Sequence, residues 1–439
     1  MHADAPHGTE HAAAGESPHY IQAVAEMGSE RDVIAHQDIY SSTGIKLVAK
    51  GSRLTPAQFE RLTQHKLTAP LDHLIDSEDP VDAEFLASTA ARILDHEPVY
   101  ARMAAHTGDA LAVKHGLAGL KLPRPALMRL TVMREKRVET FEHSIHAALI
   151  AHALAQRLAL PAADRYHLLM AAICHDFGEM HTDPTILAAG HDIGPAERNF
   201  VHVHPVTGYV LLHDMPGFPL AAAQAVLHHH ERQDGSGYPH AMRAQRIPLL
   251  SRLLAVADVA ETVIRRHDLP RLDVLVRLNQ ARFDTRTVGA LRDLIHATPN
   301  DAAARPHEHG AMTQLRHIAE LLQAWGVLRS SFEAAVAPRD TSDSPLAFLF
   351  ERMASIRGVV LQAGFDPDHV DSMLDIARGD PGLLLELRGY LDELDWLLLD
   401  LAHEIDRRAP QMAGLPHMPI DGLIMHLQPM RHGGEGRRA

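Results

Sequence analysis

The segment RYHLLMAAICHDFG (residues 165–178) combines the features that decide the predicted fold and the predicted site. Its uninterrupted apolar run LLMAAIC indicates a buried helix, and Gly178 follows at a position where helices commonly end. His175 and Asp176 stand between the two, and a charged aspartate is costly to bury unless a cation compensates it. The pair is therefore a candidate for metal ligation, although taken alone it is explained at least as simply by a helix-end cap.

Residues 138–298 have apolar residues at helical spacing, which predicts a series of helices. About every 25 to 30 residues, a histidine or an acidic residue that could bind a metal interrupts an otherwise apolar helix. Glu139 and His143 are four residues apart and share one face of a helix. Asp258 places a carboxylate inside the apolar stretch LLAVADVAETV. Each is weak evidence alone, because a surface contact also explains a Glu–His pair. Together they favour a metal, which would compensate all the buried acids at once.

Histidines supply the other candidate ligands. LHHHERQDGSGYP (residues 227–239) contains three adjacent histidines, of which at most two neighbours can serve one cluster. In FVHVHPVTGY, His202 and His204 point to different faces of a helix and compete for one role. Imidazoles and carboxylates without thiolates suit iron, manganese or zinc in a catalytic site with open positions, rather than a closed structural zinc site. The single cysteine, Cys174, is expected to be a small core residue.

Composition excludes several classes of protein. A net charge of -14 over 439 residues argues against a general binder of nucleic acid polymers or anionic membranes, since both need a basic surface. One cysteine excludes an internal disulfide framework, and the start of the chain lacks the pattern of a secretory signal. No apolar run is long enough for a membrane span. We therefore expect a cytoplasmic globular protein.

The chain is predicted to be mainly α-helical with several units. DVIAHQDIYSSTGIKLVAKGSRLTPAQFERLTQHKL predicts two short strands joined at the SSTG turn, then a helix capped by Thr55 with Pro56 first and a capping box to Gln58. A proline-containing segment at 296–311 indicates a linker. The expected units are a disordered tail at 1–30, a small α+β module at 31–79, a helical domain at 80–300, a C-terminal helical domain at 312–410 and a flexible tail at 411–439. Within the C-terminal domain, helices are expected near 312–335, 346–362, 367–378 and 381–407.

Taken in chain order, these motifs resemble the HD-GYP family, a branch of the HD phosphohydrolase superfamily whose members hydrolyse the second messenger cyclic di-GMP. The HD signature is matched by His175-Asp176 in ICHDFGEMHTDPTIL, and the downstream His-Pro by His204-Pro205. The HHExxDGxGYP segment is matched by residues 229–239. The resemblance is specific in these motifs and covers residues 135–265.

Three further positions fit the same family. The family's first histidine is matched by His143 in FEHSIHAAL, and its helix-borne aspartate by Asp258 in AVADV. Glu139 fits the additional acidic ligand of members that hold three metals.

The resemblance implies an HD-type helical bundle that holds two or three divalent transition-metal ions, with iron or manganese expected. The implied metal ligands are Glu139, His143, His175, Asp176, His204, His229, His230 and Asp258, with His228 left as a bystander. His175 and Asp176 would be the catalytic residues, with Asp176 bridging neighbouring metals. A metal-bridging hydroxide would attack phosphorus in line, giving linear pGpG or GMP.

The resemblance also implies a substrate pocket shaped by Gly237, Tyr238 and Pro239, with Tyr238 contacting guanine or phosphate. A turn made by Gly235 and Gly237 explains the glycines without any ligand. Arg265 and Arg266 stand near the place of the family's phosphate-binding segment, and a surface role fits them equally well.

Two positions depart from the family pattern. The family usually has HDxGK, and Glu179 stands here in place of the lysine, where its charge would repel a diester unless it turns away or serves the metals. After Asp258 the chain has AETVIRRHDLPRLD in place of an Arg-Pro-Tyr segment. Two alternatives therefore stay open: a non-catalytic module that binds nucleotide or only metal, and an HD hydrolase of another phosphate ester. Cyclic di-GMP, a signalling protein bound through the C-terminal helical domain and a second copy of the chain are the expected partners.

Overall fold

The computed structural model describes residues 17–109, 111–188, 195–266, 269–296 and 347–362, with parts of 390–405. Helices dominate these residues and strands are few, which confirms the predicted mainly α-helical class. The expected tail at 411–439, the expected helices near 312–335 and 367–378, and most of the expected linker lie outside the described residues.

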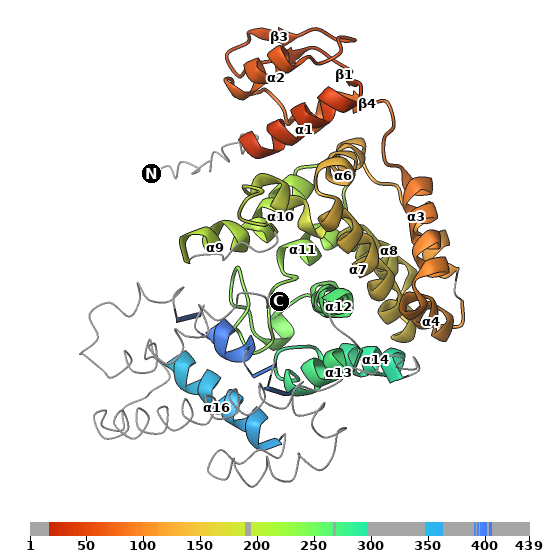
Figure 1. Ribbon diagram of the computed structural model, residues 1–439, viewed down its shortest axis with the longest axis vertical. Helices are drawn as coiled ribbons and strands as arrows, with labels where there is room; N and C mark the ends of the chain where they lie inside the picture. The colour runs from red at the N-terminus through yellow and green to blue at the C-terminus, as the bar shows by residue number, and fades with distance from the viewer. Residues whose placement is uncertain are drawn as a thin grey trace, which may run out of the picture.

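The N-terminal module is a small α+β unit at the top of Figure 1. Its elements are α1 (Pro18–Glu30), β1 (Val33–Ala35), β2 (Ile39–Tyr40), β3 (Lys46–Val48), α2 (Pro56–Thr63), η1 (Leu71–His73) and β4 (Ile75–Ser77). β1 pairs with β4, and β2 pairs with β3 around the SSTG turn, both antiparallel. Thr55 caps α2 and completes the predicted capping box with Gln58.

Helix α1 corrects the expectation of a disordered tail at 1–30 for residues 18–30, while residues 1–16 lie outside the described residues. Ser17 caps it by accepting a hydrogen bond from the backbone of His19, and Tyr20, Val24 and Met27 are completely buried along one face. This spacing of three and four residues is that of an amphipathic helix. The apolar face of α1 is therefore stabilised by packing on α2, α6 and η2.

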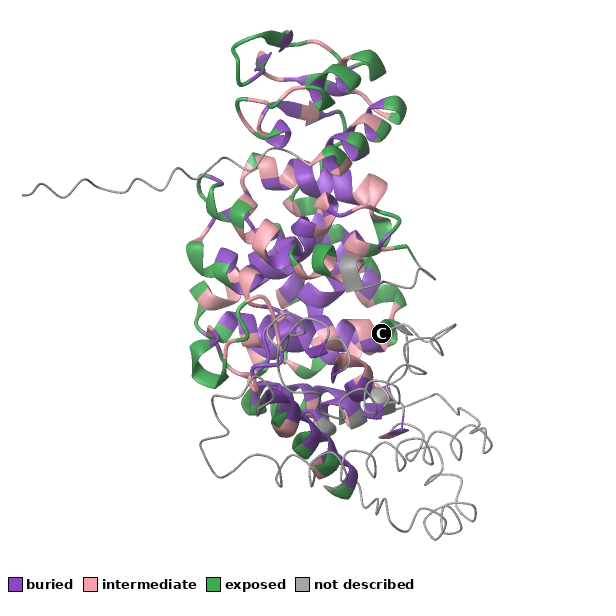
Figure 2. Cartoon of the chain, turned by 90° about the vertical axis from the view of Figure 1, so that its left-hand side faces the viewer, coloured by how far each residue is buried: buried purple, intermediate pink, exposed green. Residues whose placement is uncertain are grey.

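The helical bundle follows the module and fills the centre of Figure 1. Its elements are α3 (Ala83–His96), α4 (Pro98–His106), α5 (Ala112–Ala118), α6 (Arg124–Lys136), α7 (Val138–Arg157), α8 (Ala162–Cys174), η2 (His175–His181), α9 (Pro195–His202), α10 (His204–His213), α11 (Leu220–Leu227), η3 (Ala244–Arg246), α12 (Leu249–Arg266), α13 (Leu269–Leu278) and α14 (Thr285–His296). Helix α7 packs against both α8 and α12 and is buried along most of its length. Figure 2 shows the buried residues gathered along this central part.

The module and the bundle share a buried polar contact. The guanidinium of Arg129 on α6 pairs with Asp72 on η1, and both side chains are almost completely buried. Arg129 Nη1 also lies 3.0 Å from Nε2 of His181, at the end of η2. Tyr20 stacks on the ring of His181 and lies under the Arg129 guanidinium. Module and bundle are thus joined beside the segment that carries His175 and Asp176.

The described C-terminal residues pack against the bundle. Helix α16 (Ala347–Gln362) lies at the bottom of Figure 1. The buried Arg352 of this helix donates hydrogen bonds to Asp234 at 3.0 Å and to Asp400 at 2.7 Å. The C-terminal part therefore touches the loop that contains the DGSGYP motif.

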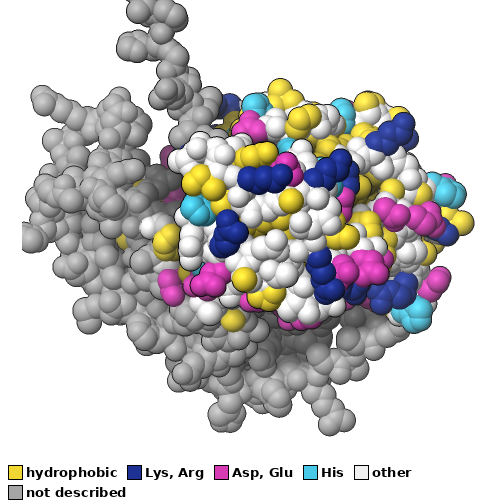
Figure 3. Space-filling model, turned by 90° about the horizontal axis from the view of Figure 1, so that it is seen from above, with side chains coloured by type: hydrophobic (Ala, Val, Ile, Leu, Met, Phe, Trp, Pro, Cys, Tyr) yellow, Lys and Arg dark blue, Asp and Glu magenta, His cyan; other side chains and the backbone are white. Residues whose placement is uncertain are grey.

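The surface is of mixed charge. On the face shown in Figure 3, Lys and Arg side chains are interspersed with Asp and Glu side chains. Arg31, for example, pairs with both Asp79 and Glu135. None of the described helices combines the length and the apolar character that a bilayer crossing requires.

Candidate metal centre

The centre is built around the point where α8 ends. Asp176 leaves the helical conformation at φ -96° and ψ 15°, and η2 continues in a new direction. Gly178 is required here, because a Cβ atom at this position would lie 2.0 Å from the carbonyl oxygen of His204. The close approach of the two backbones brings the first residue of α10, His204, next to Asp176.

Asp176 stands between two groups of imidazoles. Its Oδ2 atom is 3.2 Å from Nε2 of His175 and 3.7 Å from Nε2 of His143. Its Oδ1 atom is 3.6 Å from Nε2 of His204 and 3.9 Å from Nε2 of His229. One carboxylate thus presents one oxygen to each group, which is the arrangement of a bridging ligand.

The first group contains His143, His175 and Asp258, all buried. Nε2 of His143 lies 3.2 Å from Nε2 of His175 and 3.2 Å from Oδ1 of Asp258. Nδ1 of His143 contacts the carboxylate of Glu261, whose side chain is completely buried. Glu261 therefore fixes the orientation of the ring from the side opposite the cluster.

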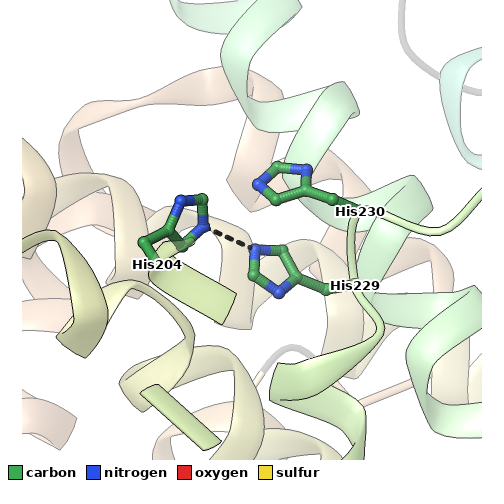
Figure 4. Close-up of side chains that lie close together, drawn as sticks. All are labelled: His204, His229 and His230. Atoms are coloured by element: carbon green, nitrogen blue, oxygen red, sulfur yellow. Dashed lines mark hydrogen bonds between the residues drawn. The ribbon is translucent and has the colours of Figure 1, made fainter. Parts of the chain in front are cut away.

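The second group contains His204, His229 and His230, shown in Figure 4. Nε2 of His204 and Nε2 of His229 face each other at 3.3 Å. The ring centroids of His229 and His230 are 4.0 Å apart. The Nδ1 atom of His230 lies 3.8 Å from Oδ2 of Asp258. Asp258 therefore also reaches toward both groups, from α12.

The donor atoms fit divalent metal ions. Nδ1 of His175, His204 and His229 each bonds a backbone carbonyl oxygen, at 2.8, 2.7 and 2.6 Å. Because a neutral imidazole has one N–H, a donating Nδ1 leaves the Nε2 lone pair directed into the cluster. Facing lone pairs repel each other unless a cation lies between them. Within the described part of the chain, neither Asp176 nor Asp258 pairs with a lysine or arginine.

The protonation states of Asp176 and His229 match those that a metal needs. Burial opposes ionisation of Asp176, but the charge of His175 and the hydrogen bond with it outweigh burial and lower its pKa. Burial, together with the charge of His175, lowers the pKa of His229 to about 3. At neutral pH Asp176 is a carboxylate and His229 a neutral imidazole, which are the metal-binding forms of both side chains. Burial opposes protonation of His143 and His175, but the neighbouring carboxylates outweigh it and raise both pKa values, so a bound metal would have to displace these protons.

Tyr238 lies at the edge of the second group. Its ring stacks on His230 at 4.7 Å and on His202 at 4.2 Å between ring centroids. The loop that carries it needs both glycines: Gly235 has φ +82°, and a Cβ atom on Gly237 would lie 2.4 Å from the backbone nitrogen of Arg232. The glycines are thus explained by the loop itself.

The structure brings seven of the eight proposed ligands together. These are His143, His175, Asp176, His204, His229, His230 and Asp258. The eighth, Glu139, is exposed in the first turn of α7 and belongs to none of the ligand groups that the described residues form. His228 stays outside both groups, as expected, and Cys174 is buried in the core.

The proposed phosphate-binding arginines are not placed at the cluster. Arg265 is exposed and pairs with the distal oxygen of Glu261 at 3.2 Å, and the side chain of Arg266 lies outside the described residues. Glu261 itself was not predicted. Its position three residues after Asp258 puts the two acids on one face of α12, and that spacing is the signal that could have identified it.

Glu179 lies near the centre and turns partly away from solvent. Its Oε2 atom accepts a hydrogen bond from Oγ1 of Thr140 at 3.3 Å. Burial, followed by the negative charge of Asp176, raises the pKa of Glu179 to about 8. A glutamate therefore stands near Asp176 at the position where the HD-GYP pattern has a lysine.

Part of the chain is similar in sequence to known proteins. Residues 125–285 match the family model described as HD domain. A protein named cyclic di-GMP phosphodiesterase PA4108 from Pseudomonas aeruginosa is 33% identical over 138 residues, which is 31% of this chain and 33% of the relative. The cyclic di-GMP phosphodiesterase response regulator RpfG of Xanthomonas campestris is 35% identical over 116 residues, 26% of this chain and 31% of the relative.

A third relative is named for a different cyclic dinucleotide. The 3'3'-cGAMP-specific phosphodiesterase 3 of Vibrio cholerae is 27% identical over 175 residues, 38% of this chain and 38% of the relative. The chain thus spans about a third of the length of the relatives it matches. The residues matched by the family model, 125–285, include both ligand groups.

Proposed function

Residues 125–285 carry an HD domain, and from this premise we propose that the protein is a metal-dependent phosphodiesterase that hydrolyses cyclic di-GMP to linear pGpG or GMP. The observation that carries the proposal is the position of Asp176, with one carboxylate oxygen toward each of two imidazole groups. Hydrolysis of a phosphodiester is a reaction for which paired metal sites are well suited. The names of two relatives support cyclic di-GMP as the substrate.

We propose two divalent metals, iron or manganese, as the resident ions. His143, His175 and Asp258 would hold one, and His204, His229 and His230 the other, with Asp176 shared. Mixed imidazole and carboxylate ligands without thiolate suit these metals. When bound, such ions acidify water and stabilise negative charge on the phosphoryl oxygens. A third ion at Glu139 would require that exposed side chain to turn toward the cluster.

The protein's own side chains would position both metals and substrate. Glu261 holds the ring of His143, and backbone carbonyls hold the rings of His175, His204 and His229. This fixed orientation lowers the cost of assembling the site at the moment of reaction.

Tyr238 would contact the ligand through its hydroxyl group. Its ring already stacks on His202 and His230, so less of the ring face is free for a guanine base. A hydroxyl contact predicts that Tyr238→Phe weakens cyclic di-GMP binding nearly as much as Tyr238→Ala. Gly237 and Pro239 would serve by holding Tyr238 in place.

A second substrate, 3'3'-cGAMP, is a further candidate because relatives named for it also match this chain. Both messengers are cyclic dinucleotides joined by phosphodiesters, so the same metals would cleave either one. The bases differ, and selectivity would depend on residues that contact them.

A non-catalytic signalling role is the competing proposal. Glu179 supports it, because this buried carboxyl group stands where the HD-GYP pattern has a lysine and so supplies no positive charge to attract a negative diester. The contacts of Arg352 with Asp234 would then link nucleotide binding at the loop to the C-terminal part and its signalling partner. In either role, a protein that responds to an intracellular messenger acts in the cytoplasm.

One experiment separates these proposals. The full chain is purified with iron or manganese, its bound metal is measured, and its products from cyclic di-GMP and from 3'3'-cGAMP are followed by chromatography. Asp176→Asn is the matched control, since it keeps the shape of the bridging side chain without its charge. Metal-dependent cleavage that Asp176→Asn abolishes is expected. Bound metal and bound nucleotide without cleavage would refute the enzymatic proposal and support the signalling role.

A further inference from the structure

A second cluster of metal-ligand side chains lies beside the candidate metal centre and shares no residue with it. It consists of His228, Glu231 and His240, whose donor atoms all lie within 4.8 Å of one another. Nδ1 of His228 is 4.0 Å from Oε1 of Glu231, and Nδ1 of His240 is 3.9 Å from the same oxygen. Two imidazole nitrogens thus converge on one carboxylate oxygen.

Glu231 is a buried anion held only by neutral donors. Its side chain is completely buried. Oε1 accepts a hydrogen bond from the backbone of His240 at 2.7 Å, and Oε2 accepts one from the backbone of Met242 at 2.8 Å. No lysine or arginine in the described ranges pairs with it. A buried carboxylate in this situation gains from a nearby cation.

His228 supplies an independent observation. Its Nδ1 atom is buried and has no hydrogen-bond partner within the described structure. The residue is the C-cap of α11, immediately before His229, yet its ring belongs to the Glu231 cluster and not to the group around His204. An unpartnered buried nitrogen that lies near a carboxylate is the group that a metal would satisfy.

We propose that His228, Glu231 and His240 bind a zinc-class divalent cation, separate from the ions of the HD domain. Two imidazole nitrogens and one carboxylate oxygen are a normal zinc ligand set, with solvent as the fourth ligand. Tetrahedral ligands at about 2.1 Å from zinc lie about 3.4 Å apart, so the observed separations need only a small closing movement. His240 can supply that movement, since its side chain is 55% exposed.

A cation at this position would restrain the loop that carries Tyr238. His228 ends helix α11, while His240 comes two residues after Tyr238. A cation bound by both would tie the helix end to the far side of the loop that presents Tyr238. Occupancy would therefore restrict the movement of that loop without contacting the ligands of the HD domain.

Zinc binding by the metal-free full chain tests the proposal. Zinc is titrated in competition with a chromophoric chelator, for the wild type and for His240→Gln. The exposed His240 can be replaced without disturbing the core, and its backbone bond to Glu231 remains. His213→Gln is the matched control, because His213 is 49% exposed and lies outside the cluster. The expected result is one zinc equivalent fewer for His240→Gln, and no change for His213→Gln.

A second pair of variants separates this site from the HD domain. His228→Gln should lose the same zinc equivalent as His240→Gln, whereas Asp176→Asn should retain it. This result is expected whether or not the protein cleaves cyclic di-GMP, so the two proposals fail independently. Equal zinc stoichiometry and affinity in the wild type, His228→Gln and His240→Gln would overturn the inference.

Discussion

The buried carboxylate of Glu261 contacts Nδ1 of His143 from the side of the ring that faces away from the metal ligands. The contact fixes the ring so that Nε2 points toward His175 and Asp258. We expect Glu261→Gln to weaken metal affinity by about 10-fold or more, as is usual when the partner of a ligating histidine is changed. Chelator competition measures this affinity. Glu142→Gln is the control, because Glu142 is exposed and lies on α7 next to His143. Equal metal affinity in both variants would contradict the role of Glu261 in holding His143.

The number of bound metals depends on Glu139. Because this side chain is exposed and outside the ligand groups, we expect Glu139→Gln to bind as many metal ions as the wild type. Elemental analysis of the purified proteins gives the count. A loss of one ion per chain in Glu139→Gln would show that the side chain turns inward and completes a third metal site.

A lysine in place of Glu179 is expected to favour binding of a phosphodiester. Burial and the charge of Asp176 raise the pKa of Glu179 to about 8, so the carboxyl group is mainly neutral at neutral pH and offers a phosphate no attraction. Glu179→Lys adds a positive charge there, so it should raise the affinity for cyclic di-GMP or the rate of its cleavage. Calorimetry and the chromatographic assay measure the two quantities. An unchanged or lower value would mean that the hydrogen bond from Thr140 to Glu179 is part of the functional site.

The buried pair of Arg129 and Asp72 is expected to be essential for stability. Removing one partner leaves the other charge buried and unpaired, which costs about 3–5 kcal/mol. Urea unfolding of Arg129→Met should show a loss of this size. Arg31→Met breaks the more exposed pairs with Asp79 and Glu135 and should lose about 1 kcal/mol or less. If the two variants lost the same amount, the Arg129 contact would be no more important than a surface pair.

Stability is expected to fall on mild acidification because of His152. Burial, followed by the charge of Arg165, lowers its pKa to about 4 in the folded protein. The unfolded chain, with a histidine pKa of about 6.5, binds the proton first, so the free energy of unfolding falls between pH 6.5 and pH 4 by up to about 3 kcal/mol and this contribution then levels off.

The variant His152→Gln tests the pH dependence. It cannot titrate, so its unfolding free energy should fall less steeply across this range than that of the wild type. His106→Gln, an exposed change, should keep the wild-type slope. Parallel profiles for wild type and His152→Gln would show that other groups cause the acid sensitivity.

The sequence predicted correctly those helices and strands that are determined by residues close together in the chain. The capping box of Thr55 and Gln58, the hairpin at SSTG and the buried run of α8 all depend on residues close together in the chain. The α1 helix was missed because its stability comes from packing on the module and η2, which a composition-based expectation of disorder does not contain. Local patterns predict elements well, and tertiary contacts decide the exceptions.

The candidate metal centre likewise combines features that the sequence shows with features that only the tertiary contacts decide. The sequence by itself determined which motifs are present. The burial cost of acids in apolar helices singled out Asp176 and Asp258, and the resemblance to the HD-GYP family predicted the full set of ligands, of which seven meet in one cluster. Only the tertiary structure decided which oxygen of Asp176 faces which imidazole group, that Glu139 stays outside, and that Glu261 holds His143. It also separated His228 from His229, although they are neighbours in sequence. The reason is physical: ligand identity is a property of single residues, whereas the direction of a lone pair is set by helices that meet only in the folded chain.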